Sequence, residues 1–192
     1  MQFPLKPYTT AVVPFAYWDG GFSASELDWL QEKAACASTP GLTGRSKEVA
    51  SDIRRSNISW LQNNNESLWV FEKLAHIVST LNQQFFRLDI TSFSEALQLT
   101  NYSSCNEGMY GWHQDFGAPG ISRKLSVVIQ LTDPSEYEGG NLQVFNSQEP
   151  KNVRKERGLV TVFPSYTVHQ VTPVTQGNRQ SLVGWVSGPA FR

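Results

Sequence analysis

The sequence has few cysteines, few charges and no long apolar run, and each shortage excludes a class of protein. Cys36 and Cys105 are its two cysteines, too few for a disulfide framework or a zinc knuckle. No segment approaches the roughly 18 apolar residues that a membrane span needs. The first residues also lack the basic start and apolar stretch of a signal peptide. We therefore expect a cytoplasmic protein with reduced thiols and no membrane partner.

The charge balance and the composition narrow the class further. Sixteen Lys and Arg stand against seventeen Asp and Glu in 192 residues, so the basic excess typical of nucleic-acid binders is missing. Hydrophobic residues make up 40% of the chain, which excludes a disordered protein. Aromatic residues reach 12%, a composition that β-strands favour. The length suits one domain over 1–192.

The first half of the chain predicts two helices. Ser23 and Glu26 form a capping box, which predicts a helix over about 24–37. Over 70–85 the apolar residues recur with a period of 3.6, which predicts a second helix whose N-cap lies within 63–65. The apolar stripe of that helix consists of Val70, Phe71, Leu74, Ile77, Val78, Leu81 and Phe85.

Strand patterns dominate the rest of the chain. Residues 53–60 alternate as one strand, and 40–52 has the composition of a polar loop. After residue 93 the apolar period changes to two, and 138–140 and 176–178 carry turn signals. The expected strands lie at about 95–102, 109–114, 124–132, 141–145, 159–163, 167–172 and 180–187. This succession predicts a β-sandwich or barrel with a helical layer on one side, an α+β fold.

Two of the three histidines belong to a candidate metal site. His113 and Asp115 stand two apart in a strand-like stretch, which points both side chains to the same face. His169 lies in a later strand. Two histidines and one carboxylate form the facial triad of non-haem Fe(II) oxygenases. His76 lies off the apolar stripe of its helix and is interpreted as a surface residue.

Arg179 adds a candidate anion anchor to this triad. A guanidinium grips a carboxylate with two parallel hydrogen bonds, and Ser181 shares its strand face and can donate to the same oxygens. A metal triad together with an anchored carboxylate suits 2-oxoglutarate, which needs one end on iron and the other on a cation. The alternative for Arg179 is a surface ion pair.

Four stretches of the chain resemble the Fe(II)/2-oxoglutarate-dependent oxygenases, specifically the prolyl 4-hydroxylase-like group of small bacterial and phage hydroxylases. They contain, in the order of that family, the His-x-Asp segment, a strand before a Gly-Gly turn, the distal histidine segment and the closing strand. The stretches are 101–115, 125–142, 163–174 and 179–185. The resemblance implies a mainly β double-stranded β-helix, or jelly roll, over about 94–190, with helical support over about 1–93.

The resemblance also assigns roles to particular residues. It implies iron on His113, Asp115 and His169, with Arg179 and Ser181 at the distal carboxylate of 2-oxoglutarate. The co-substrates are 2-oxoglutarate and dioxygen, and ascorbate is an optional reductant. Tyr102 and Gln130 are expected at 2-oxoglutarate, and the expected pocket or substrate residues are Tyr110, Trp185, Arg54 and Arg55. The alternatives are core packing for Tyr110 and Trp185 and a solvated strand edge for the two arginines.

Hydroxylation of an unactivated C–H bond is the expected reaction. A carboxylate at Asp115 favours hydroxylation, because the related halogenases have a small residue there. The resemblance favours a prolyl or other side chain in a peptide or protein, although collagen-type enzymes often have Lys where this chain has Arg179. Alternatives are a free small molecule, a nucleic-acid base, or a jelly-roll binding module without catalysis. The basic run 151–157 is either a solvated loop or a surface for an acidic partner.

Overall fold

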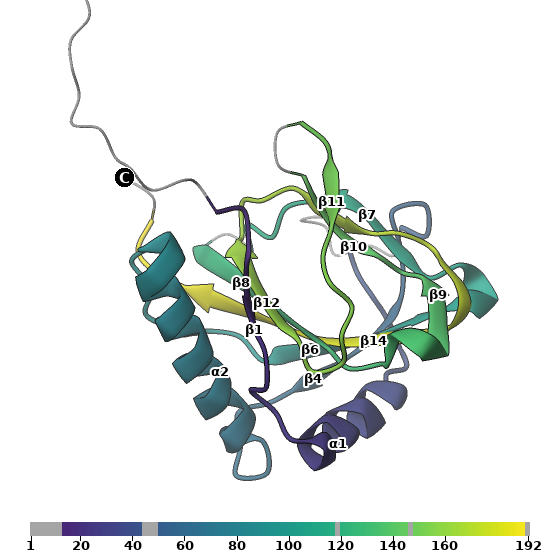
Figure 1. Cartoon of the computed structure of the whole chain (residues 1–192), viewed down its shortest axis with the longest axis horizontal. Helices are drawn as coiled ribbons and strands as arrows, with labels where there is room; N and C mark the ends of the chain where they lie inside the picture. The colour runs from purple at the N-terminus through teal and green to yellow at the C-terminus, as the bar shows by residue number, and fades with distance from the viewer. Residues whose placement is uncertain (1–12, 44–49, 118–119, 146–147, 191–192) are drawn as a thin grey trace, which may run out of the picture.

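The computed structural model describes residues 13–43, 50–117, 120–145 and 148–190. Within them, two antiparallel sheets enclose a lumen, and α1 and α2 lie on the outer side of the larger sheet (Figure 1). The larger sheet runs β1-β12-β8-β14-β6-β4-β2, with β5 and β9 also paired to β14. The smaller sheet runs β11-β10-β13-β7-β3. This is the expected double-stranded β-helix with supporting helices.

The strands of the larger sheet are β1 (Ala16–Trp18), β2 (Thr39–Pro40), β4 (Asn57–Leu61), β5 (Ser92–Phe93), β6 (Leu97–Ser103), β8 (Arg123–Gln130), β9 (Tyr137–Gly139), β12 (Val160–Pro164) and β14 (Val174–Ser187). Those of the smaller sheet are β3 (Arg54–Arg55), β7 (Met109–His113), β10 (Leu142–Phe145), β11 (Pro150–Asn152) and β13 (His169–Val171). Short 3-10 turns occupy Ser104–Asn106 and Pro134–Glu136.

Both helices bury an apolar face against the larger sheet. Helix α1 (Ala24–Ala35) begins at Ser23 with the predicted capping box, whose Glu26 accepts the Ser23 backbone N–H at 2.7 Å. Helix α2 (Leu68–Leu81) carries the predicted apolar stripe, and a π-helical turn (Asn82–Phe86) follows it. No helix within the described ranges is long and apolar enough to cross a membrane.

Strand β8 shows how one strand serves both sides of the larger sheet. Val127 and Ile129 belong to the core beneath the helices. Val128 belongs to the second cluster, inside the lumen. Because side chains of a strand alternate between its faces, Gln130 shares the lumen side with Val128, as predicted. From β8, the lumen therefore receives the polar side chain of Gln130, and the core beneath the helices receives the apolar side chains of Val127 and Ile129.

The predicted strand over 53–60 is wrong, because the chain changes sheets within it. Arg54–Arg55 pairs with β7 in the smaller sheet, whereas Asn57–Leu61 pairs with β6 in the larger sheet. Ser56 is buried at the crossing and accepts a hydrogen bond from Nε of Arg54 at 2.8 Å. Alternation alone cannot show a crossing, since the local period continues through it.

Three smaller predictions also differ from the structure. Helix α2 begins at Leu68 and not after 63–65, because Asn64 caps the preceding turn by accepting the backbone N–H groups of Glu66 and Ser67. Phe85 is exposed, since the π-helical turn rotates it off the apolar stripe. Residues 176–178 lie inside β14, where a register shift against β9 bends the strand.

The predicted polar loop over 40–52 is only partly described. Pro40 ends the short strand β2, and residues 44–49 lie outside the described ranges.

The packing of α2 on the larger sheet predicts a large loss of stability from one truncation. Leu74 is fully buried in the core beneath the helices. We expect Leu74→Ala to lower the free energy of unfolding by about 2–5 kcal/mol, because it removes apolar contacts and leaves a cavity. Urea denaturation followed by circular dichroism measures it. Glu72→Ala on the exposed side of the same helix is the matched control, and equal losses in both variants would contradict the packing.

Candidate active site

The pairing of two strands in the smaller sheet brings the two candidate histidines together. His113 is the last residue of β7 and His169 the first of β13, and the two residues are direct partners in the antiparallel register. Their ring centroids lie 4.1 Å apart. Asp115 follows two residues beyond His113, and its backbone N–H donates to the Ser165 carbonyl at 2.8 Å. The three side chains thus meet from segments far apart in sequence.

The ligand atoms of these residues converge on one point. Nε2 of His113 lies 3.7 Å from Oδ1 of Asp115, and Nε2 of His169 lies 3.5 Å from Oδ2. All three ligand atoms lie within 4.8 Å of one another. Nδ1 of His113 bonds the Gly111 carbonyl at 2.7 Å and Nδ1 of His169 bonds that of Thr167 at 2.9 Å. Carbonyl partners keep both Nδ1 atoms protonated and leave both Nε2 lone pairs for a metal.

The protonation states of this group suit metal binding. Burial lowers the pKa of His113 to about 4, and the nearby His169 ring acts in the same direction. His113 is therefore neutral at ordinary pH. Burial opposes ionisation of Asp115, but the two imidazoles and the Ser126 and Trp185 donors outweigh it, so the pKa of Asp115 lies below its usual value. Two imidazoles and one carboxylate are the donor set that Fe(II) takes in a facial triad.

Two side chains orient Asp115 from the larger sheet. The Ser126 hydroxyl donates to Oδ2 of Asp115 at 2.8 Å. The Trp185 indole N–H is buried and acts on the same carboxylate, although its geometry falls short of a regular hydrogen bond and it has no other partner among the described residues. Partners of this kind hold a metal-binding carboxylate in its working orientation. The sequence analysis placed Trp185 in the pocket but missed Ser126.

Aromatic side chains surround the histidines. The Tyr110 ring stacks on His113 with centroids 3.5 Å apart, and Phe163 meets His169 edge-on at 4.8 Å. On the other side, Arg123 lies 3.8 Å above the Trp185 ring while it is held by two 2.6 Å bonds to Glu95. These rings limit the access of water to the ligand atoms, as oxidative chemistry at a metal requires.

Arg179 reaches the lumen from β14. It is only 3% exposed, and its guanidinium lies 5.5 Å from the Tyr102 ring centroid. Gly140 has φ +55°, and a Cβ at this position would come within 2.9 Å of the Arg179 side chain. The absence of a side chain at Gly140 therefore gives Arg179 its room. Among the described residues no carboxylate pairs with Arg179.

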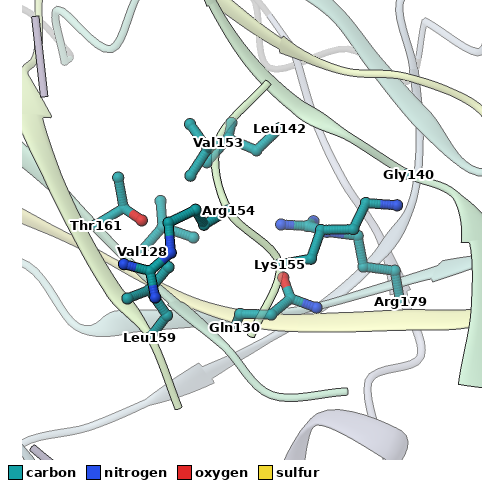
Figure 2. A pocket seen from close by; sticks show the side chains of 10 residues that line it. All are labelled: Val128, Gln130, Gly140, Leu142, Val153, Arg154, Lys155, Leu159, Thr161 and Arg179. Carbon is teal, nitrogen blue, oxygen red and sulfur yellow. The ribbon is translucent and has the colours of Figure 1, made fainter. Parts of the chain in front are cut away.

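A buried guanidinium without a counter-charge is costly, and this one fits a carboxylate ligand. Figure 2 shows the pocket around Arg179, with Gln130 and Lys155 beside it. Gln130 donates to the Tyr137 hydroxyl at 3.1 Å. Ser181 is buried two residues along the same strand face. Sequence analysis missed Tyr137 and Lys155 here, because the pattern of residues 151–157 gave no sign that one of its cations turns inward.

The two arginines predicted to contact the substrate have different surroundings. Arg54 is 7% exposed and lies 4.6 Å from the Tyr110 ring centroid, and its Nη2 donates to Oε1 of Gln98 at 2.8 Å. Arg55 instead bonds the backbone carbonyls of Asn106 and Glu107. The structure therefore brings Arg54 to the triad, whereas the Arg55 guanidinium is engaged by the turn before β7.

The cations of the basic run 151–157 also differ in their partners. Arg154 pairs with Glu156 at 2.9 Å, and Arg157 pairs with Asp28 at 2.7 Å. These two charges are balanced by neighbouring acids, so the run is not a uniform basic surface. Lys155 is the member that turns toward Arg179.

Comparison with known proteins places this arrangement in a family. The jelly roll with a lumenal His-Asp-His group is the architecture of an iron-dependent oxygenase. Residues 97–187, slightly under half of the chain, match the 2OG-Fe(II) oxygenase superfamily, in which 2OG denotes 2-oxoglutarate. The matched segment is therefore a 2OG-Fe(II) oxygenase domain, and the chain resembles prolyl 4-hydroxylases in its fold. The family implies Fe(II), 2-oxoglutarate and dioxygen, and His113, Asp115 and His169 can bind the iron.

Curated relatives match the same half of the chain. A PKHD-type hydroxylase of Prochlorococcus marinus is 38% identical over 87 residues, which are 44% of this chain and 39% of the relative. A PKHD-type hydroxylase of a Synechococcus strain is 42% identical over 91 residues, 46% of this chain and 40% of the relative. The matched segments thus span about two fifths of the length of these relatives.

Solved structures share the fold over nearly the whole chain. A Pseudomonas putida prolyl-4-hydroxylase has a TM-score of 0.71 at 19% identity and covers 92% of this chain and 94% of its own. A Trichoplax adhaerens prolyl hydroxylase, solved with a hypoxia inducible factor peptide fragment, has a TM-score of 0.76 at 16% identity, with coverage of 91% and 84%.

The convergence of the three ligand atoms predicts the effect of removing any one of them. We expect His113→Ala, Asp115→Ala and His169→Ala each to lose Fe(II) binding, because two donors cannot hold the facial geometry. Calorimetric titration with Fe(II) under nitrogen measures the affinity. His76→Ala is the control, since His76 is exposed on α2. Wild-type affinity in the His169→Ala variant would refute the ligand set.

Proposed function

We propose that the protein is an Fe(II)- and 2-oxoglutarate-dependent dioxygenase that hydroxylates an unactivated C–H bond, most readily a prolyl or other side chain of a peptide or protein. One observation carries the proposal. Three metal-ligand atoms converge at one side of a lumen that also holds a buried arginine without a carboxylate partner among the described residues. 2-Oxoglutarate needs a metal at one end and a cation at the other. The same lumen thus contains ligands for the metal and, in Arg179, the cation.

The residues of this chain divide the work of the reaction among them. Bound iron and 2-oxoglutarate supply the oxidising power that inserts one oxygen atom of dioxygen into a C–H bond. His113, Asp115 and His169 would hold the metal through two imidazole nitrogens and one carboxylate oxygen, a ligand set that leaves positions for co-substrates. Arg179 orients the distal carboxylate through charge-assisted hydrogen bonds. Asp115 fills the ligand position that halogenases leave open, which favours hydroxylation.

A peptide substrate is supported by the surroundings of Arg54. This second buried guanidinium has no carboxylate partner within the described part of the chain, and its charge acts on the pKa of His113, lowering it together with burial. Three of its five N–H groups bond Ser56, Leu42 and Gln98, and the other two suit a backbone carbonyl of a substrate. Two apolar residues lie next to Arg54, because Leu42 accepts a hydrogen bond from it and Ile53 precedes it in the chain. Their side chains are 40% and 47% exposed.

Trp60 extends this apolar surface from the larger sheet. It is 45% exposed, and its ring lies 6.3 Å from that of the buried Trp185. Proline suits an aromatic surface, because its stiff ring loses little entropy on binding. The solved Trichoplax relative binds a peptide at the same fold, which supports a peptide over a free metabolite.

Arg179 provides a first test. We expect Arg179→Leu to raise the 2-oxoglutarate concentration needed for half-maximal decarboxylation, because losing a buried charged partner costs about 2–5 kcal/mol. Arg179→Lys should be milder, since the charge remains but the forked geometry is lost. Succinate formed without any substrate measures the uncoupled reaction. An unchanged 2-oxoglutarate requirement in the Leu variant would exclude Arg179 as the anchor.

The substrate class needs a parallel comparison. Proline-rich peptides, free amino acids and single-stranded oligonucleotides are offered to the Fe(II)-loaded protein, and succinate and product mass are measured for each. We expect succinate and an added oxygen atom with the peptides. Products from only the amino acids or only the oligonucleotides would overturn the peptide assignment and keep the iron chemistry. No 2-oxoglutarate decarboxylation at all would leave a binding module without catalysis.

A further inference from the structure

Lys155 is partly buried, whereas its two neighbours Arg154 and Glu156 are exposed. It lies in the segment between β11 and β12, and its Nζ donates to the Gly139 carbonyl at 2.7 Å. The same Nζ lies 4.8 Å from the Tyr137 ring centroid. Lys155 and Arg179 line the same pocket, as Figure 2 shows.

Tyr137 and the Gly139–Gly140 turn bring the two cations together. The Arg179 side chain packs where Gly140 lacks a Cβ, and Lys155 bonds the carbonyl of the preceding glycine. Tyr137 contacts both cations, since Lys155 lies over its ring and Arg179 hydrogen-bonds its hydroxyl. The two positive charges therefore share one wall of the pocket.

Among the residues that line the pocket, no acid balances this pair of cations. The residues that line the pocket are Val128, Gln130, Gly140, Leu142, Val153, Arg154, Lys155, Leu159, Thr161 and Arg179, and none is a carboxylate. Burial lowers the pKa of Lys155, and the charge of Arg179 acts in the same direction. Two neighbouring like charges in a partly buried pocket repel each other unless an anion joins them.

A purely structural role explains this arrangement less well. The bond to the Gly139 carbonyl needs only one donor, which a neutral side chain could supply without repelling Arg179. An ammonium carries three donors, so two remain for a ligand after that bond. The repulsion is relieved when a carboxylate sits between the ammonium and the guanidinium.

We propose that Lys155 is a second cation for the distal carboxylate of 2-oxoglutarate and selects co-substrates that carry a charge at that end. The inference rests on the proposed function and adds to it a residue that acts together with Arg179. Lys155 holds one carboxylate oxygen as a point charge, while Arg179 grips the carboxylate with its planar fork. A chain with Arg179 alone would bind the same co-substrate more weakly.

Equilibrium binding tests this proposal without turnover. 2-Oxoglutarate is titrated by calorimetry into the full chain loaded with Mn(II), in place of Fe(II). We expect Lys155→Met to weaken 2-oxoglutarate binding about tenfold or more, the effect of losing a hydrogen bond to a charged group. Lys155→Arg should restore most of the affinity. The Mn(II) affinity should be the same in all variants, because Lys155 contacts none of the three ligands.

Lys151→Met is the matched control. Lys151 is a cation of the same basic run, but it is exposed on β11 and does not line the pocket, so its removal should leave 2-oxoglutarate binding within about twofold of wild type.

Each other outcome overturns the assignment. Wild-type affinity in Lys155→Met would remove Lys155 from the site. Equal losses in Lys155→Met and Lys151→Met would indicate a general attraction of the basic segment. A loss that Lys155→Arg does not restore, or a parallel loss of Mn(II) affinity, would indicate a packing role. If the wild-type protein binds Mn(II) but no 2-oxoglutarate, the proposed function itself fails and this inference fails with it.

Discussion

The antiparallel pairing of β7 with β13 is the constraint on which the candidate site depends. It sets His113 directly opposite His169, and the bonds of both Nδ1 atoms to backbone carbonyls two residues earlier aim the two Nε2 atoms at one point. A slip of one residue in this register would turn one imidazole to the outer face of the sheet. Asp115 needs no strand partner of its own, because Ser126 of the larger sheet holds its carboxylate.

Two buried guanidinium groups without a carboxylate partner are the second feature of the lumen. Arg54 and Arg179 are both buried, and no carboxylate pairs with either among the described residues. Most buried cations in proteins are paired, and Arg123, which holds Glu95 beside the Trp185 ring, follows that rule here. Arg123 is thus a structural cation with a partner in the protein. Arg54 and Arg179 are cations whose negatively charged partner we expect to be a ligand. These two unpaired charges thus favour an anionic co-substrate.

The Gly139–Gly140 turn connects these charges to the fold. Both glycines have positive φ, and a Cβ at Gly139 would lie 2.1 Å from the Pro173 carbonyl oxygen. The turn therefore brings β9 and the start of β10 close against β14, which carries Arg179. The same turn accepts the Lys155 bond. The two glycines of this turn thereby determine how closely Lys155 and Arg179 approach each other. The Gly-Gly pattern in the sequence does not by itself indicate this role.

Local patterns in the sequence determined many of the secondary-structure elements and part of the candidate site. These patterns are the capping box at Ser23, the apolar stripe of α2, the alternation in β8 and the His-x-Asp spacing. Each is a property of neighbouring residues, and each is present in the structure. Residue types also indicated the distant partners His169 and Arg179, and the resemblance to a family supplied the jelly roll. Only the tertiary structure decided that residues 53–60 divide between two sheets, that Arg54 turns to the triad while Arg55 does not, and that Lys155 faces Arg179. The reason is that the periodicity of a sequence shows which residues share one face of a helix or strand. It does not show which residues that face contacts, because those residues come from distant segments of the chain.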